Sequence, residues 1–439
     1  MEDLLAARLQ MAISLGFHII FACIGMAMPF LMAIAEYKWI KTGQQVLSRL
    51  GESLVKRRCH LLCYRGGFGH GIVIRAWLAL AHLYGACGPI FGMPFSWEGT
   101  AFFVEAIALG LFLYGWDKLR PWVHWGTGLV VGISGVASGI FVVAANAWMN
   151  SPAGFDWVNG QAINIDPVAA MFNDAWLSQA IHMTLAAFVA TGFAVAGLHA
   201  LLLLKDRRNR FHRKAFKIAL AVGAVAAILQ PVSGDYSAKD VAERQPAKLA
   251  ALESHFETEK SADLIIGGLP DVEEREVNYA IRIPGMLSFL AHGDFNAEIT
   301  GLDQIPREEW PPVVVTHIAF QIMVGAGMVM MLVGLLYLFL YWKKPHTLYS
   351  SWFLWLVGIC TPLGFIAVEA GWTVTEVGRQ PWIIYGIMKT EDALTSMPGL
   401  QYTLYMITGL YLLLSVIVTW LMYRQIITLA DRYETAKND

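Results

Sequence analysis

Long runs without charge are the feature of this 439-residue sequence that most constrains its fold. Residues 313–342 and 399–423, for example, contain no Asp, Glu, Lys or Arg. A helix of about 20 apolar residues crosses the roughly 30 Å of hydrocarbon in a bilayer. Only 15% of the residues are charged, whereas about a quarter is usual in a soluble domain. The sequence therefore predicts an all-α, polytopic membrane protein.

Nine membrane helices are expected. The first starts after only a few residues and has no basic leader or cleavage site, so we interpret it as a retained helix. The second is the weakest because Arg and His interrupt it. The expected ranges are 10–36, 57–84, 98–117, 124–149, 177–204, 215–232, 313–342, 351–372 and 400–423.

One long polar stretch, at 233–309, is too charged to lie in lipid, and loops of this length are usually functional or disordered. It divides the chain into residues 1–232 with helices one to six, the polar loop at 233–309, and residues 310–439 with helices seven to nine and a tail. Basic residues gather in alternate loops, while the loop at 150–176 has no Lys or Arg. By the positive-inside rule, the N-terminus and the long loop lie outside and the C-terminal tail lies in the cytoplasm.

Several functions are disfavoured by the remaining composition. A net charge of −2 gives no sign of a nucleic-acid partner. Five scattered cysteines predict no disulfide framework. The absence of an internal repeat weakens a transporter built from two related halves.

Ionisable side chains inside apolar helices are costly, so each is a candidate site residue. Imidazole and thioether groups are both haem-iron ligands, which draws attention to His18, His182 and Met323, and a carboxylate such as Glu376 could hold a further haem with one face open. However, a membrane histidine is more often hydrogen-bonded between helices, and a methionine there is usually core. The sequence pattern alone does not choose among the histidines, because the same argument applies to His124, His199, His292 and His317.

Two acidic residues of the third helix, Glu98 and Glu105, are seven positions apart. That spacing corresponds to two helical turns and puts both on one face. Paired carboxylates inside a membrane suggest a proton path. The alternative is that one or both lie at the interface and are simply solvated.

Four longer motifs bring in a known family. The stretches EGTAFFVE, ANAWMNSPAGF, QPAKLAALE and GRQPW together resemble subunit I of the cytochrome bd quinol oxidases. The resemblance covers nearly the whole chain except about residues 50–87. It implies a subunit of an enzyme of the bacterial cytoplasmic (inner) membrane that oxidises quinol, reduces dioxygen to water and separates charge without pumping. It also implies a second membrane subunit and often a very small third one.

The resemblance implies cofactors and their ligands. His182 and Met323 match the axial ligands of a low-spin haem b. His18 and Glu376 match the ligands of two high-spin haems, one a haem b and the other a haem d or a further haem b. Which of these two haems each residue holds stays open.

The resemblance also implies roles for other polar residues. Glu98 and Glu105 match the acidic pair on the family's proton route, and Lys248 and Glu253 match a loop pair implicated in quinol binding. Trp372 and Arg379 lie beside Glu376 in the matching segment. A cation there could pair with haem propionates.

The sequence departs from the family at two places. Gln321 stands where many members have Arg, which resembles the cyanide-insensitive branch. Members of that branch can carry haem b in place of haem d, so the choice between haem d and a further haem b stays open. Residues 56–87 lack the family's stretch like GTVLSFELGLLWP, and a shifted reading frame of this segment could restore it. We therefore hypothesise a local frameshift there, which also disfavours a metal site at Cys59, His60 and Cys63.

Two other function classes remain as alternatives. A transporter or channel could use the membrane Glu and His residues for proton coupling, but it does not need the His182–Met323 pair. A b-type cytochrome anchor of a dehydrogenase usually uses two histidine ligands and needs neither a membrane carboxylate ligand nor a long outer loop.

Overall fold

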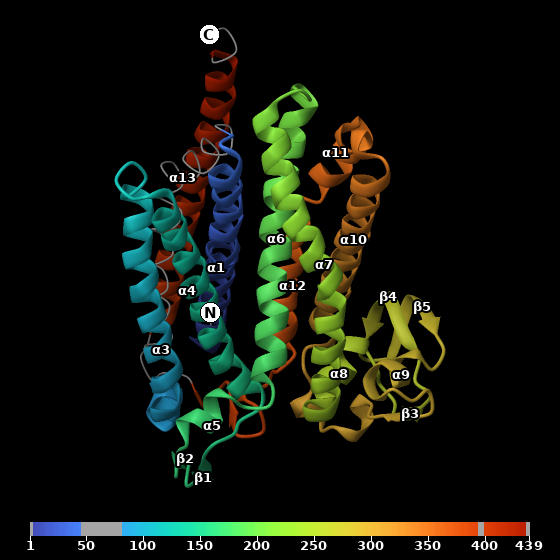
Figure 1. Ribbon diagram of the computed structural model, residues 1–439. Coiled ribbons are helices and arrows are strands. Elements are labelled where there is room, and N and C mark those ends of the chain that lie inside the picture. The colour runs from blue at the N-terminus through green and yellow to red at the C-terminus, as the bar shows by residue number, and fades with distance from the viewer. Residues whose placement is uncertain (1–2, 45–80, 394–398, 436–439) are drawn as a thin grey trace.

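The computed structural model describes residues 3–44, 81–393 and 399–435. Within this part of the chain, eight helical segments are long and apolar enough to cross a membrane (Figure 1). The all-α membrane fold is thereby confirmed. The predicted second helix lies outside the described residues up to position 80, so the count of nine stays a prediction. The long helices are α1 (Asp3–Thr42), α3 (Ala81–Tyr114), α4 (Pro121–Asn150), α6 (Trp176–Lys205), α7 (Arg210–Arg244), α10 (Val313–Lys343), α11 (Ser351–Ile359) with α12 (Leu363–Val377), and α13 (Leu400–Thr435).

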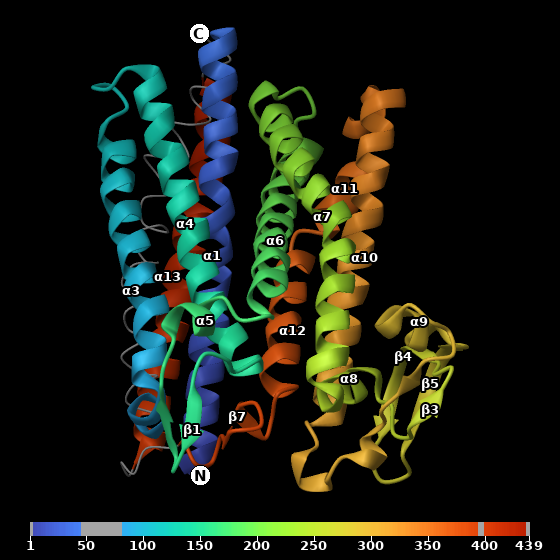
Figure 2. The same cartoon turned by 60° about the horizontal axis from the view of Figure 1, so that its bottom comes forward.

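The helices form one elongated bundle. Helices α1, α3, α4 and α13 stand together on one side, and α6, α7, α10 and α12 on the other (Figures 1 and 2). Small residues permit close packing between α6 and α7: a Cβ on Gly192 would lie 2.7 Å from the Cα of Gly223. Such small-residue contacts are a common way for membrane helices to approach each other.

The third membrane helix is longer than expected. It begins at Ala81, whereas the sequence predicted a second helix ending at 84 and a third starting at 98. Pro89 and Pro94 lie inside α3. Proline is tolerated in membrane helices because neighbouring groups satisfy the freed backbone carbonyls, so the Gly- and Pro-containing stretch did not mark a connection.

The sixth predicted helix also extends, from 232 to Arg244, so the first part of the predicted polar loop is helical. Ion pairs four residues apart stabilise these polar turns: Lys239 to Asp235 at 2.6 Å and Arg244 to Asp240 at 3.4 Å. The eighth predicted helix, 351–372, is interrupted between α11 and α12 and continues to Val377.

The rest of the outer loop is an ordered unit. Strands β4 and β5 pair as an antiparallel hairpin and β3 pairs with β6. Side chains including Ala250, Phe256, Ile265, Val277 and Leu302 form its core. Its elements are α8 (Pro246–Glu253), β3 (Glu259–Lys260), β4 (Leu264–Asp271), β5 (Glu276–Ile283), α9 (Met286–His292), β6 (Glu298–Ile299) and two short 3-10 helices at Leu302–Gln304 and Arg307–Glu309.

This loop unit lies at one end of the bundle, the end at which α1 begins (Figure 2). Two smaller hairpins share that end, and α13 finishes at the opposite end. The arrangement agrees with a long loop and an N-terminus on one side, and the side of the membrane stays a prediction. The smaller elements are β1 (Asp156–Val158), β2 (Gln161–Ile163), α5 (Pro167–Met171), β7 (Trp382–Ile384) and β8 (Met388–Lys389), with a further 3-10 helix at Pro345–Tyr349.

Candidate functional site

Glu376 lies near the end of α12 in a polar cluster. Its Oε2 accepts a hydrogen bond of 2.7 Å from Arg379, and its Oε1 accepts one from the side chain of Asn146 on α4. Arg379 is only 2% exposed, and its Nε and Nη1 have no hydrogen-bond partner among the described residues. A buried guanidinium with free donors is suited to bind an anionic group.

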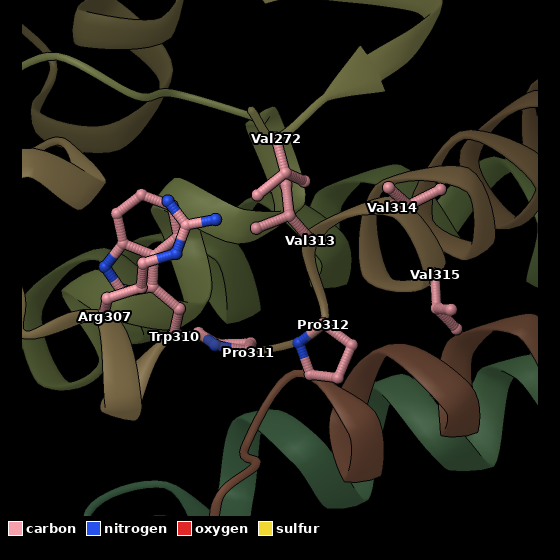
Figure 3. A pocket seen from close by; sticks show the side chains of 8 residues that line it. All are labelled: Val272, Arg307, Trp310, Pro311, Pro312, Val313, Val314 and Val315. Carbon is pink, nitrogen blue, oxygen red and sulfur yellow. The ribbon is translucent and has the colours of Figure 1, made fainter. Parts of the chain in front are cut away.

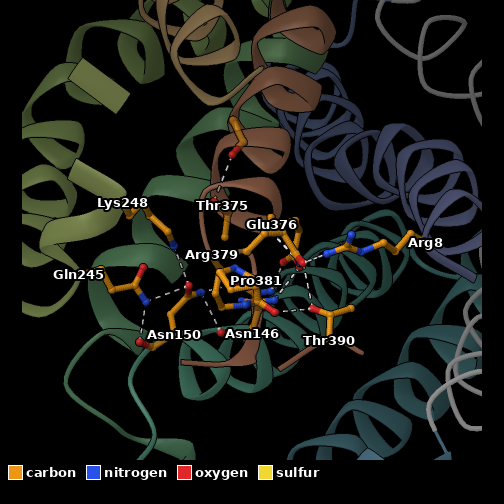
Figure 4. A network of polar contacts seen from close by, with 12 residues as sticks. Arg8, Asn146, Asn150, Gln245, Lys248, Thr375, Glu376, Arg379, Pro381 and Thr390 are labelled. Atoms are coloured by element: carbon orange, nitrogen blue, oxygen red, sulfur yellow. Dashed lines mark hydrogen bonds and ion pairs between the residues drawn. The ribbon is translucent and has the colours of Figure 1, made fainter. Parts of the chain in front are cut away.

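Two asparagines connect this cluster to the outer loop (Figure 4). Asn150 donates to both oxygens of Asn146 at 3.0 Å, one helical turn away. Lys248 of α8 donates to Asn150 Oδ1 at 2.8 Å, and Gln245 donates to the Asn150 backbone oxygen at 2.6 Å. A continuous set of polar contacts therefore runs from the loop to the end of α12. Neither asparagine was singled out from the sequence, although both lie in the motif ANAWMN.

Burial changes the acidity of the two loop residues. The pKa of the Lys248 amine lies well below its ordinary value because of desolvation and then the nearby Arg379 charge, with Glu376 acting in the opposite direction. Burial raises the pKa of the Glu253 carboxyl to about 8. Each side chain is 4% exposed. A carboxyl with a pKa near neutrality is suited to exchange protons.

His182 lies on α6, half-buried and facing α7. Its Nδ1 is 3.0 Å from the hydroxyl of Ser233, and its Nε2 is 3.1 Å from the side-chain nitrogen of Gln230. A hydrogen bond from Nδ1–H to Ser233 would leave Nε2 with the lone pair that a metal ligand needs. Gln230 would have to release Nε2 for iron to bind there.

Met323 lies on α10 with its sulfur against the α12 backbone. A Cβ on Gly371 would lie 2.9 Å from Met323 Sδ. Both α6 and α10 pack against α7 and α12, so His182 and Met323 project from two helices that share these neighbours. Trp372 packs in the same region, in an apolar cluster of α1, α6 and α12 side chains.

The α1–α12 interface contains an acidic residue that sequence reasoning missed. Glu369 Oε1 is buried and has no hydrogen-bond partner among the described residues, and its Oε2 would lie 3.0 Å from a Cβ on Gly16. His18 is half-buried two residues further along α1. Glu369 precedes Glu376 by two helical turns, so their shared face was the available signal.

The acidic pair on α3 has two environments. Glu98 is half-buried, and its Oε1 accepts a hydrogen bond of 3.1 Å from Ser138 on α4. Glu105 is only 4% exposed. The alternative of a simply solvated side chain is therefore wrong for Glu105. Both carboxyls lie on α3, and Glu98 faces α4.

The other candidate histidines have partners or lie at the surface. His124 Nδ1 is 2.7 Å from the buried carboxylate of Glu36. His199 and His212 approach at 3.0 Å between their Nδ1 atoms, and His317 contacts two backbone carbonyls. His292 is exposed. Within the described ranges, no group of three His, Cys, Asp or Glu side chains could hold a metal ion by itself. The Cys59, His60 and Cys63 motif lies outside these ranges.

A cavity of about 280 Å³ lies where the outer loop enters α10 (Figure 3). Arg307, Trp310, Pro312 and Val272 are among its lining residues, and the Arg307 guanidinium is 5.4 Å from the centre of the Trp310 ring. None of the site residues predicted from the sequence lines this cavity.

Comparisons with known proteins agree on one family. The model of the family described as cytochrome bd terminal oxidase subunit I matches residues 6–429. A Bacillus subtilis (strain 168) protein, whose provisional name is cytochrome bd menaquinol oxidase subunit I, is 34% identical over 96% of both chains. The cytochrome bd ubiquinol oxidase subunit 1 of the same organism is 29% identical over 97% of this chain and 94% of its own. The solved bd oxidase of Geobacillus thermodenitrificans has a TM-score of 0.91 at 34% identity, covering 97% of this chain and 99% of its own.

Proposed function

The chain belongs to the cytochrome bd terminal oxidase subunit I family, and we propose that it is the haem-bearing subunit of an enzyme that oxidises quinol and reduces dioxygen to water. It is a multi-pass membrane protein, and its family works with a second subunit in a membrane complex. We place this complex in the bacterial cytoplasmic membrane, with a very small third subunit as a further expected partner.

Three haems are proposed, held by residues that suit them. His182 and Met323 would hold a low-spin haem b, while His18 and Glu376 would each hold a high-spin haem, one haem b and the other haem d or a further haem b. Two buried Arg379 donors have no partner among the residues that the structure describes, which supports a site for anionic propionates beside Glu376. When bound, haem supplies the one-electron relay and the oxygen chemistry that the protein side chains do not provide.

The outer loop would bind quinol and receive its protons. Oxidation of one quinol to quinone releases two electrons and two protons. Glu253, whose carboxyl pKa is about 8, can accept and pass on a proton near neutral pH. Lys248 would position the substrate as a hydrogen-bond donor, since burial disfavours its charged form.

Protons for water would come from the opposite side of the membrane. Two quinols and one dioxygen give two quinones and two water molecules, so four protons are taken up. Glu105 and Glu98 would carry them, because buried carboxylates on one helix face can exchange protons in sequence. Release outside and uptake inside separate charge without a pump.

The observation that carries this proposal is the polar path from Lys248 through Asn150 and Asn146 to Glu376. It joins the residues proposed for quinol to a residue proposed for haem. No observation specifically favours either alternative function. A transporter or channel needs no such path. A cytochrome anchor with two histidine ligands is not supported either, because the His199 and His212 rings touch each other and leave no space for iron between them.

The test is quinol-dependent oxygen uptake together with a reduced-minus-oxidised absorption spectrum, in membranes containing this chain and its partner subunit. We expect uptake and b-type haem bands. A chlorin band in the red would establish haem d, and its absence beside b-type bands would favour the cyanide-insensitive branch. Membranes that contain the protein but show no haem signal would contradict the proposal.

A further inference from the structure

One face of α10 binds the outer loop by hydrogen bonds from two side chains one helical turn apart, His317 and Gln321. Gln321 Oε1 accepts a hydrogen bond of 2.9 Å from the Gly267 amide, and its Nε2 donates to the Ile265 carbonyl at 3.0 Å. His317 Nε2 lies 3.1 Å from the Gly267 carbonyl. Both backbone polar groups of Gly267 are thus held by α10.

His317 also reaches the end of α8. Its Nδ1 lies 2.7 Å from the carbonyl of Leu252, and the ring is completely buried. Carbonyl oxygens only accept, so each contact is a hydrogen bond when the ring nitrogen that faces it carries the proton. Leu252 lies in the last turn of α8, where a helix leaves carbonyl oxygens without intrahelical donors.

The backbone conformation of β4 makes these hydrogen bonds to α10 possible. Gly267 and Gly268 both have positive φ, 69° and 93°, and the pairing of β4 with β5 omits Gly268 and Tyr279 opposite each other without a change of register. A Cβ on Gly268 would lie 2.6 Å from Val277. The left-handed backbone at these two glycines directs the Gly267 amide and carbonyl toward α10.

These hydrogen bonds lie beside the loop residues proposed to bind quinol. Leu252 is followed by Glu253, and it packs in an apolar cluster with Ala319 of α10 and Val374 of α12. A Cβ on Gly378 would lie 3.2 Å from both Lys248 and Thr316, which shows how closely α8, α10 and the end of α12 approach. Displacing β4 or the end of α8 would therefore move Lys248 and Glu253.

We propose that His317 and Gln321 are positioning residues of the quinol site, which hold β4 and the end of α8 on α10 so that Lys248 and Glu253 face the substrate. The inference rests on the proposed quinol oxidation. It also gives Gln321 a role in this chain: the amide donates to one backbone group and accepts from another, which an arginine at this position could not do.

The test compares His317→Phe and Gln321→Leu with the wild type, in the purified complex, using a reduced short-chain benzoquinone as substrate. Losing one side of a buried hydrogen bond leaves the other side unsatisfied, so we expect KM for quinol to rise about tenfold or more while kcat and the haem spectrum stay nearly unchanged. His317→Gln retains one donor and should be intermediate. His292→Phe, at an exposed histidine of the same loop, is the matched control.

A second readout does not depend on activity. Trypsin should cut the hairpin at Arg275 and Arg282 faster in both variants than in the wild type or the control. Wild-type KM and cleavage rates in both variants would overturn the proposal, as would loss of the low-spin haem signal, since the residues would then stabilise the bundle. Absence of quinol oxidation in the wild type would instead refute the proposed function. The trypsin cleavage rates would still show whether His317 and Gln321 hold the outer loop on α10.

Discussion

Lys248 in the outer loop donates a hydrogen bond of 2.8 Å to Asn150, the last residue of α4. Asn150 in turn donates to Asn146, whose side chain contacts Glu376. The loop that would bind the reductant is thus joined by side chains to the end of the helix that would hold a haem. In a buried network of this kind each member depends on its neighbours, because an unsatisfied polar group is costly there.

Replacing Asn150 by Ala should test this connection. The change leaves the buried Lys248 amine without its acceptor, at a cost of about 1–3 kcal/mol. We expect about a tenfold fall in kcat/KM for quinol, with the b-type haem bands retained. Steady-state oxygen uptake measures the first and absorption spectra the second. Asn164→Ala, in an exposed turn between β2 and α5, serves as the control, and equal losses in the two variants would contradict the connection.

Glu253→Gln should change the pH dependence of stability. The carboxyl pKa is about 8 in the folded chain against an ordinary 4.5, so the folded state holds the proton more tightly. The unfolding free energy therefore falls as pH rises from 4.5 to 8, where the proton is lost. We expect the thermal midpoint of the wild type to fall over this interval and that of the variant to fall less. Parallel curves would show that Glu253 does not titrate in this way.

Gly371→Ala should alter the low-spin haem without unfolding the bundle. The added Cβ would lie 2.9 Å from Met323 Sδ, the mobile end of a flexible side chain, so the sulfur would shift while the helices stay in place. We expect a changed b-type absorption band and a lower reduction potential. The control is Gly409→Ala, where no atom of the residues that the structure describes lies within 4 Å of an added Cβ. Met323→Leu, of similar volume, should abolish the low-spin signal altogether.

Glu105→Gln should slow proton uptake while leaving quinol binding intact. The side chain is 4% exposed, and the amide keeps its shape but cannot carry a proton. A positioned proton-transfer group contributes about 100-fold or more, so kcat should fall by that order while KM for quinol is unchanged. Oxygen uptake at varied quinol concentration separates the two quantities. A rise in KM with unchanged kcat would place Glu105 outside the proton route.

The sequence was informative where burying a charged or polar group costs free energy, because this cost restricts which residues occur there. Uncharged runs gave the membrane fold, because lipid excludes charge. Lys248, Glu253 and Glu105 were singled out from the sequence, and all three are buried in the structure. Helix ends were less predictable: ion pairs carry α7 into the polar stretch to Arg244, and α3 includes two prolines. The hydrophobic periodicity of the sequence does not show where ion pairs extend a helix or where a helix tolerates proline.

Residues that act through long-range contacts were the hardest to find. Nothing in the surroundings of Gln321 in the sequence shows that its amide binds a strand more than fifty positions earlier. Asn146 and Asn150 likewise gain their meaning only when α4, α8 and α12 meet. Their roles depend on tertiary packing, whereas the proposed haem ligands carry distinctive chemistry in their own side chains.

The two adjacent glycines of β4 divide the hairpin into a base held to α10 and a more exposed tip. The base is held to α10 at Gly267. The turn at 272–275 lies beyond it, and its acidic residue Glu273 is 80% exposed at the side chain and forms a surface ion pair of 2.8 Å with Arg307. A peptide tag or a fluorescent label introduced between Glu273 and Glu274 should therefore be tolerated. The hairpin thus offers an attachment point from which the loop of an intact, working complex could be followed.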